Sequence, residues 1–178
     1  NGPFVRYKCP VVEPDDILFK NIAVNPAVVY NNNKYTMIMK GDDVDKKQWF
    51  RIQLVGESTL AEGPFKFEKE PVYDKAQTED ACMWFDQELK LYFMVCHVMG
   101  KRDLALFYSD NAKDWEPHER SVFMKKEVLL EDGTLWKPER VERPYVLTDD
   151  TGKPTMLFVA IADQGVNGNI AIPIYYGE

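Results

Sequence analysis

The 178-residue sequence has little of several features that common functional classes require. Its three cysteines include no Cys-x-x-Cys pair, which excludes a disulfide framework and argues against a zinc site. Cys82 and Cys96 lie in apolar segments and are expected to be buried thiols. Apolar runs such as Leu91 to Cys96 are far below the roughly 18 residues of a membrane-spanning helix. No basic and then apolar leader opens the sequence, so no signal peptide is predicted.

Positive charge is also scarce. The sequence has 22 Lys and Arg against 29 Asp and Glu, for a net charge of −7. Unselective binding to nucleic acid or to an anionic membrane needs a basic face, so neither partner is expected. The sequence is 45% hydrophobic and has no low-complexity tract, which excludes a disordered chain and predicts a packed core.

What the sequence does have is an internal repeat, with units that start near residues 25, 79 and 142. Each unit has a polar pair, a short apolar run, a polar turn and a second apolar run. The runs are rich in β-branched and aromatic residues, which favours strands, and the turns are rich in Asn, Asp and Gly, as hairpins require. The three segments are Asn25–Met39, Glu79–Val95 and Glu142–Val159.

Two of the units continue in the same way. Third strands are predicted at Arg51–Ser58 and Asp103–Asp110, and outer fourth strands at Glu62–Phe67 and Lys113–Pro117. Trp115, on the second of these outer strands, is expected to pack between units. Four short strands in a unit of about 55 to 63 residues are typical of a β-propeller blade. The predicted fold is therefore all-β, a β-propeller of four-stranded blades.

The ends of the sequence predict an incomplete propeller. Gly2–Arg6 matches the start of a fourth strand, so residues 1–24 are expected to hold the outer strand of a preceding blade and a linker. Asn169–Ile174 is expected to be the third strand of the last blade. Residues 1–178 thus form one partial domain of about the last two and a half to three blades, and missing N-terminal blades or self-association should cover its open edges. The one short helix predicted is Lys125–Leu130.

The residues that open each first strand are the candidate functional groups. In a propeller this strand lines the central axis, so these residues should face one funnel, where two carboxylates roughly 5 to 9.5 Å apart can hydrolyse a glycosidic bond. Asp80 and Glu142 are predicted as the catalytic pair, side by side because they are taken as equivalent in the repeat. The predicted sugar contacts are Asn25, Glu79 and Arg143. An ion pair between Glu142 and Arg143, a turn-forming role for Asn25, or solvated polar pairs are the structural alternatives.

Two charged positions follow second strands. His97 is expected near the funnel, as a sugar contact or as a structural histidine. The equivalent segment of the first unit, Lys40–Asp43, is expected to be a solvated loop, with binding of an acidic or hydroxyl-rich sugar as the alternative.

These motifs resemble the five-bladed β-propeller glycoside hydrolases, in particular glycoside hydrolase family 43 and its relatives, families 117 and 130. The resemblance implies that Asp80 matches a middle Asp that orients sugar and tunes acidity, and that Glu142 matches a later acidic residue. The Asp base of the family's first blade has no counterpart here, and Ala81 stands where the family has Pro. The segments that carry the resemblance are Asn25–Val28, Glu79–Trp84, Glu142–Pro144 and Gly152–Ala160.

The resemblance implies a glycoside hydrolase that acts on a plant or algal poly- or oligosaccharide, in the periplasm or outside a bacterial cell. The chain alone is expected to be inactive, because one carboxylate is missing. No cofactor is required, and a calcium-like divalent metal on the axis is common in the superfamily, although no ligand for it can be read from the sequence. A mannoside phosphorylase-like enzyme, a non-catalytic carbohydrate-binding propeller and an interaction scaffold stay open as alternatives.

Overall fold

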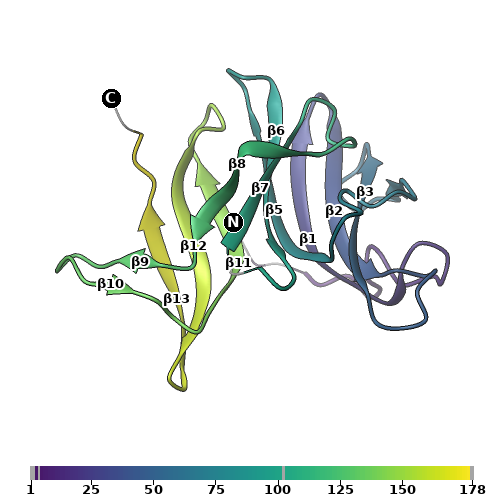
Figure 1. Cartoon of the computed structure of the whole chain (residues 1–178). Coiled ribbons are helices and arrows are strands. Elements are labelled where there is room, and N and C mark those ends of the chain that lie inside the picture. Colours follow the sequence, from purple (N-terminus) through teal and green to yellow (C-terminus); the bar gives the residue numbers. More distant parts are fainter. Residues whose placement is uncertain (1–2, 4, 102, 177–178) are drawn as a thin grey trace.

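The chain folds into three antiparallel sheets and one short hairpin (Figure 1). The computed structural model describes Pro3, residues 5–101 and residues 103–176, and no helix is formed within these residues. It therefore contains no helix that could cross a membrane in this described part.

The first sheet is β1 (Lys20–Asn31), β2 (Lys34–Asp42), β3 (Arg51–Ser58) and β4 (Lys66–Phe67). The second is β5 (Thr78–Asp86), β6 (Leu91–Val98), β7 (Asp103–Ser109) and β8 (Glu116–Lys125). The third is β11 (Arg140–Thr148), β12 (Pro154–Asp163) and β13 (Val166–Pro173), and the hairpin is β9 (Val128–Leu129) with β10 (Leu135–Trp136).

Each sheet is built from consecutive strands in chain order, as the repeat predicts. The turn between β1 and β2 places Asn32 and Asn33 at φ of 50° and 60°, which suits a two-residue hairpin whose twist matches that of its strands. The turn between β12 and β13 does the same with Gln164 and Gly165. The all-β prediction and the third strands are confirmed. The outer fourth strands are also formed, but β4 is shorter than predicted and β8 begins one residue after Trp115, which was expected to lie on it.

Two local predictions are wrong. Residues 125–130 are not helical: β8 ends at Lys125, and Val128 and Leu129 pair with β10 across a turn that holds Gly133 at φ of 84°. The hairpin geometry of this turn decides the local structure over a weak helical pattern. The outer strand expected at the N-terminus is not formed in its described residues either. Gly2 and Phe4 lie outside the described residues, and Pro3 and residues 5–19 contain no strand.

The core lies between neighbouring sheets, so the sheets stack as blades. Ile38 and Val55 of the first sheet pack with Met94 and Phe107 of the second, and Trp115 joins this cluster, as predicted. The second cluster joins the second and third sheets: Cys82, Trp84, Phe93, Val95 and Leu104 with Val141, Val146, Leu157, Val159 and Ile161. Cys82 and Cys96 are buried free thiols, as expected, and burial raises the pKa of both.

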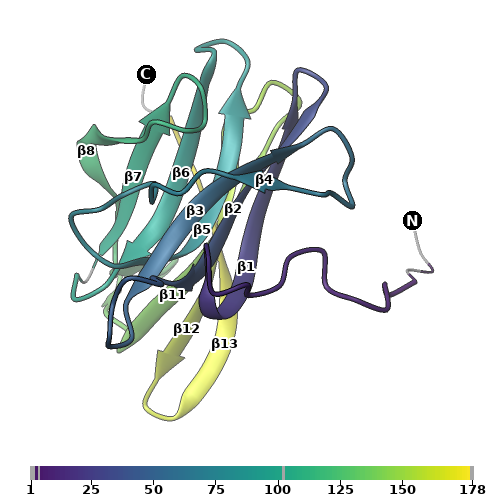
Figure 2. The same cartoon turned by 90° about the vertical axis from the view of Figure 1, so that its right-hand side faces the viewer.

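The two outermost sheets differ in how their outer faces are covered. The outer face of the first sheet, which Figure 2 views from the front, is covered by Leu18, Phe65 and Phe67 over Met37 and Leu54. On the third sheet Tyr145 and Leu147 are 58% and 45% exposed, and Phe158 is 38% exposed. An apolar sheet face of this kind is what a further blade covers in a closed propeller.

Candidate functional site

A β-bulge interrupts the innermost strand of all three sheets at the same point. Two residues of the first strand lie opposite a single residue of the second: Asn25 and Pro26 opposite Met39, Asp80 and Ala81 opposite Cys96, and Arg143 and Pro144 opposite Val159. The first residue of each bulge has a left-handed backbone, with φ of 54°, 55° and 51°. Asn and Asp adopt this conformation more readily than other non-glycine residues, whereas for Arg143 it costs about 1–2 kcal/mol.

The bulges bring three of the predicted site residues together. Asn25, Asp80 and Arg143 line one hollow of about 210 Å³, together with the residue that follows each of them. The strands that carry them are neighbours, since β5 contacts both β1 and β11. The bulge therefore explains how three units of one repeat direct an amide, a carboxylate and a guanidinium toward a common point.

The register corrects one prediction. Glu142 lies opposite Ala160, as Glu79 lies opposite His97 and Val24 lies opposite Lys40. The repeat counterpart of Asp80 is thus Arg143, and Glu142 corresponds to Glu79. Glu79-Asp80 and Glu142-Arg143 are both polar pairs. Matching Asp80 with Glu142 because both are acidic shifts the alignment of the two units by one residue. Alignment on Pro26, Ala81 and Pro144 gives the observed register.

Asp80 is held in a buried ion-pair network. Its side chain is 8% exposed, and its Oδ1 accepts hydrogen bonds from Asn25 Nδ2 and from Lys40 Nζ, the latter at 2.8 Å. Arg143 Nε lies farther off, 3.9 Å from Oδ2. Because the charge of Asp80 is already balanced by Lys40, this carboxylate is fixed in position rather than free to move to a substrate.

Lys40 is the charged side chain whose burial sequence reasoning missed. It lies within β2, is 8% exposed and contacts two carboxylates, those of Asp80 and Glu79. The solvated loop expected at Lys40–Asp43 is therefore wrong for this part, and Asp42 is also buried, paired with Arg51. The equivalence of Lys40 to His97 that the repeat indicated holds in the structure, since both lie at the same point of a second strand, but it did not indicate burial.

Glu79 joins Lys40 to His97. Glu79 Oε1 lies 3.4 Å from His97 Nδ1, and Oε2 lies 3.2 Å from Lys40 Nζ. The contact with His97 lowers the pKa of Glu79 most, burial opposes the change and Lys40 adds to it, and the pKa reaches about 2. His97 Nε2 faces the Lys101 carbonyl at 3.3 Å and Lys126 Nζ at 3.4 Å. His97 is thus buried among polar partners, close to the funnel as expected.

Glu142 lies beside the hollow rather than in it. Arg140 donates three hydrogen bonds of 2.8 to 3.0 Å to the Glu142 carboxylate. Glu142 lines an adjoining hollow of about 420 Å³ on the third sheet, and Arg143 lines both hollows. The ion pair considered for Glu142 is therefore made by Arg140 and not by Arg143.

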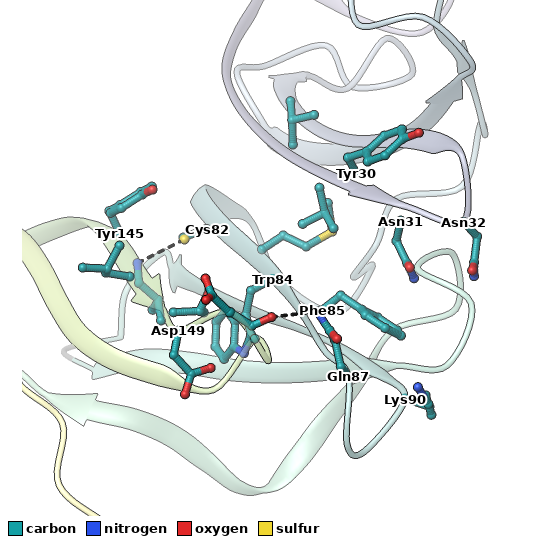
Figure 3. A pocket seen from close by; sticks show the side chains of 18 residues that line it. Tyr30, Asn31, Asn32, Cys82, Trp84, Phe85, Gln87, Lys90, Tyr145 and Asp149 are labelled. Atoms are coloured by element: carbon teal, nitrogen blue, oxygen red, sulfur yellow. Dashed lines mark hydrogen bonds between the residues drawn. The ribbon is translucent and has the colours of Figure 1, made fainter. Parts of the chain in front are cut away.

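A larger hollow, of about 810 Å³, lies at the hairpin ends of the same innermost strands (Figure 3). Figure 3 shows Tyr30, Trp84 and Tyr145 around it, and Val146 N donates to Cys82 Sγ at 3.2 Å across its floor. Asp149, which lines this hollow, accepts a hydrogen bond from Thr151 Oγ1 of the same turn at 2.7 Å. This hollow is larger, but the groups suited to acid–base chemistry lie at the bulge end.

The described residues offer no ligand set for the divalent metal considered above. Within Pro3, residues 5–101 and residues 103–176, no group of three His, Cys, Asp or Glu side chains could hold a metal ion. Glu79 and His97 contact each other, and Glu79 is also paired with Lys40.

Comparisons with known proteins rest on structure alone. No protein-family profile matches the chain, and no curated protein matches it. The β-xylosidase RS223 superposes with a TM-score of 0.64 and 16% identity, over 94% of this chain and 58% of its own. A glycosyl hydrolase from Bacteroides ovatus superposes with a TM-score of 0.60 and 20% identity, over 98% and 59%.

A third match comes from glycoside hydrolase family 130, described as mannoside phosphorylases that include hydrolases of β-1,2 mannosidic linkages in Candida mannan. Its TM-score is 0.54, with 18% identity over 94% of this chain and 56% of its own. The chain has the fold of the β-propeller glycoside hydrolases. It spans a little more than half of the length of these structures, so the predicted resemblance and the partial propeller are confirmed.

Proposed function

We propose that the chain is part of a glycoside hydrolase whose sugar-binding funnel lies at the bulge end of β1, β5 and β11. The observation that carries this proposal is the threefold bulge, which directs Asn25, Asp80 and Arg143 into one hollow. Amide, carboxylate and guanidinium groups are the hydrogen-bonding partners that sugar hydroxyls require. The match to glycoside hydrolase structures supports the proposal through the shared fold.

Each acidic residue has a separate role in the proposal. Asp80, fixed by Lys40 and Asn25, positions the sugar and sets the charge of the funnel. Glu142 is the mobile carboxylate, which must leave Arg140 to reach a glycosidic oxygen. Arg140 is 65% exposed on its side chain, so this release needs no rearrangement of the core. A further carboxylate, from blades outside this chain, completes the pair that hydrolysis needs.

The proposed substrate is a plant or algal poly- or oligosaccharide, met in the periplasm or outside a bacterial cell. The apolar face of Tyr145, Leu147 and Phe158 is proposed to pack against the remaining blades or against a second copy. A phosphorylase-like enzyme is the second candidate, favoured by the family 130 match and by the exposed Arg143 in the funnel. Dependence of turnover on inorganic phosphate separates the two.

The chain alone is expected to bind oligosaccharides and to leave aryl glycosides intact. General acid or base catalysis contributes about 10²–10⁴-fold for each group, and Asp80 is locked in its ion pairs. Glu142→Gln is expected to weaken oligosaccharide binding by about tenfold, with little effect on stability because its ion pair is exposed. Glu57→Gln is the matched control, since Glu57 is paired with Lys34 on an outer part of the first sheet.

Calorimetric titration of both variants and an aryl-glycoside assay of the purified monomer provide the readouts. Equal binding by the Glu142 and Glu57 variants argues against a role for Glu142 in the funnel. Turnover by the monomer that is lost in Asp80→Asn contradicts the proposed need for a further carboxylate.

A further inference from the structure

We propose that Arg143 binds an anionic group, a carboxylate or a sulfate, carried by the sugar that occupies the funnel. This inference rests on the proposed function, since it names the class of sugar for the same site. It depends on four observations about the charges around Arg143.

The first observation is that Arg143 is exposed and lightly held. Its side chain is 72% exposed, and its one charged neighbour in the described residues is Asp80, 3.9 Å from Nε. No hydrogen bond to its guanidinium is formed within the described part of the chain, so the planar donor edge of this group faces the two hollows. A guanidinium of this kind matches a carboxylate or sulfate with two parallel hydrogen bonds.

The second observation is that the neighbouring carboxylates do not need Arg143. Lys40 and Asn25 satisfy Asp80, and Lys40 and His97 satisfy Glu79. Arg140 takes both oxygens of Glu142. Each acid of the funnel thus has its own partner, and the positive charge of Arg143 remains for a ligand.

The third observation is the local balance of charge. Around the bulges, the side chains of Lys40, Arg140 and Arg143 balance the carboxylates of Glu79, Asp80 and Glu142, whereas the whole chain has a net charge of −7. The excess negative charge of the protein is therefore absent from the funnel mouth, which leaves an anionic ligand free to approach Arg143.

The fourth observation is the backbone of Arg143. The bulge holds it at φ of 51°, a conformation that costs an arginine about 1–2 kcal/mol, whereas Asn25 and Asp80 adopt it more easily. The surrounding strand pairing imposes this conformation, and it directs the side chain to the point where both hollows meet. Strained positions of this kind concentrate where a side chain must be presented to a ligand.

The experiment compares matched sugar pairs that differ only in the group at carbon 6, which is a carboxylate in one sugar and a hydroxymethyl in the other. NMR titration of the chain uses the methyl glycosides of glucuronate, galacturonate and mannuronate, each against its neutral hexoside, with galactose 6-sulfate as the sulfate probe. At least one acidic sugar is expected to bind about tenfold more tightly than its neutral partner. Arg143→Gln is expected to remove this preference, and Arg143→Lys to keep only part of it, because lysine lacks the planar donor edge.

Arg120→Gln is the control for net charge, since Arg120 is exposed on the outer strand β8, and it should keep the full preference. Equal binding of acidic and neutral sugars by the natural chain overturns this inference and leaves the proposed sugar-binding funnel intact. Binding of no sugar of either kind overturns both. If inorganic phosphate alone perturbs Arg143 and displaces the acidic sugar, the anion is a free co-substrate, and the sugar-borne group is wrong.

Discussion

Gly152→Ala is expected to destabilise the protein by roughly 3–5 kcal/mol. Gly152 has φ of 87°, and an added Cβ would lie 1.9 Å from the carbonyl oxygen of Phe85, in the backbone of the neighbouring blade. The backbones are held at this distance because Gln87 N donates to Thr151 O and Gln87 Nε2 donates to Asp150 O. The turn cannot move away without breaking both hydrogen bonds.

Gly165→Ala is the matched control for this prediction. Gly165 also occupies a hairpin turn of the third sheet, with φ of 81°, but an added Cβ there meets no atom within 4 Å. Gly165→Ala should lower the free energy of unfolding only by the backbone strain, about 1–2 kcal/mol. Urea denaturation of the two variants measures the difference, and equal losses of stability would show that the contact between blades at Gly152 contributes nothing.

Lys40→Met is expected to cost about 3–5 kcal/mol, because it leaves Glu79 and Asp80 buried without their shared cation. Methionine keeps the length and the apolar stem of the lysine, so packing changes little. Lys34→Met is the control: Lys34 is 53% exposed on its side chain, lies 3.4 Å from Glu57, and should cost at most about 1 kcal/mol.

A triple variant tests the cause of the Lys40 effect. Adding Glu79→Gln and Asp80→Asn to Lys40→Met removes the uncompensated charges and should recover part of the lost stability. A loss in Lys40→Met no greater than that in Lys34→Met, measured by denaturation at neutral pH, contradicts the buried network.

The strands and their grouping into blades follow from local sequence signals. Asn31 to Asn33 mark a two-residue hairpin, and the β-branched runs on either side can only form strands around it. The matching positions of Pro26, Ala81 and Pro144 identify the repeat. Turn residues and strand-forming runs act over a few residues each, so the sequence is sufficient to predict them.

The arrangement of the site depends on features that are not local. A one-residue bulge decides whether Glu142 or Arg143 faces the hollow with Asp80, and two adjacent polar residues give no hint of which one the bulge selects. The burial of Lys40 depends on the blade that packs against it. The ion pair of Glu142 depends on Arg140, which lies outside the repeated motif. The residues of the funnel were therefore largely predicted, and their pairing was not.

The central claim is that sugar binds at the bulge end of the innermost strands and not in the larger hollow at their hairpin ends. Backbone NMR of the isotopically labelled chain, titrated with the tightest-binding oligosaccharide, tests it most directly because both ends carry reporters. Shifts are predicted at Asn25, Asp80 and Arg143, with the indole of Trp84 unchanged. Shifts at Trp84 and Gln87, with the three bulge residues unchanged, would contradict the account.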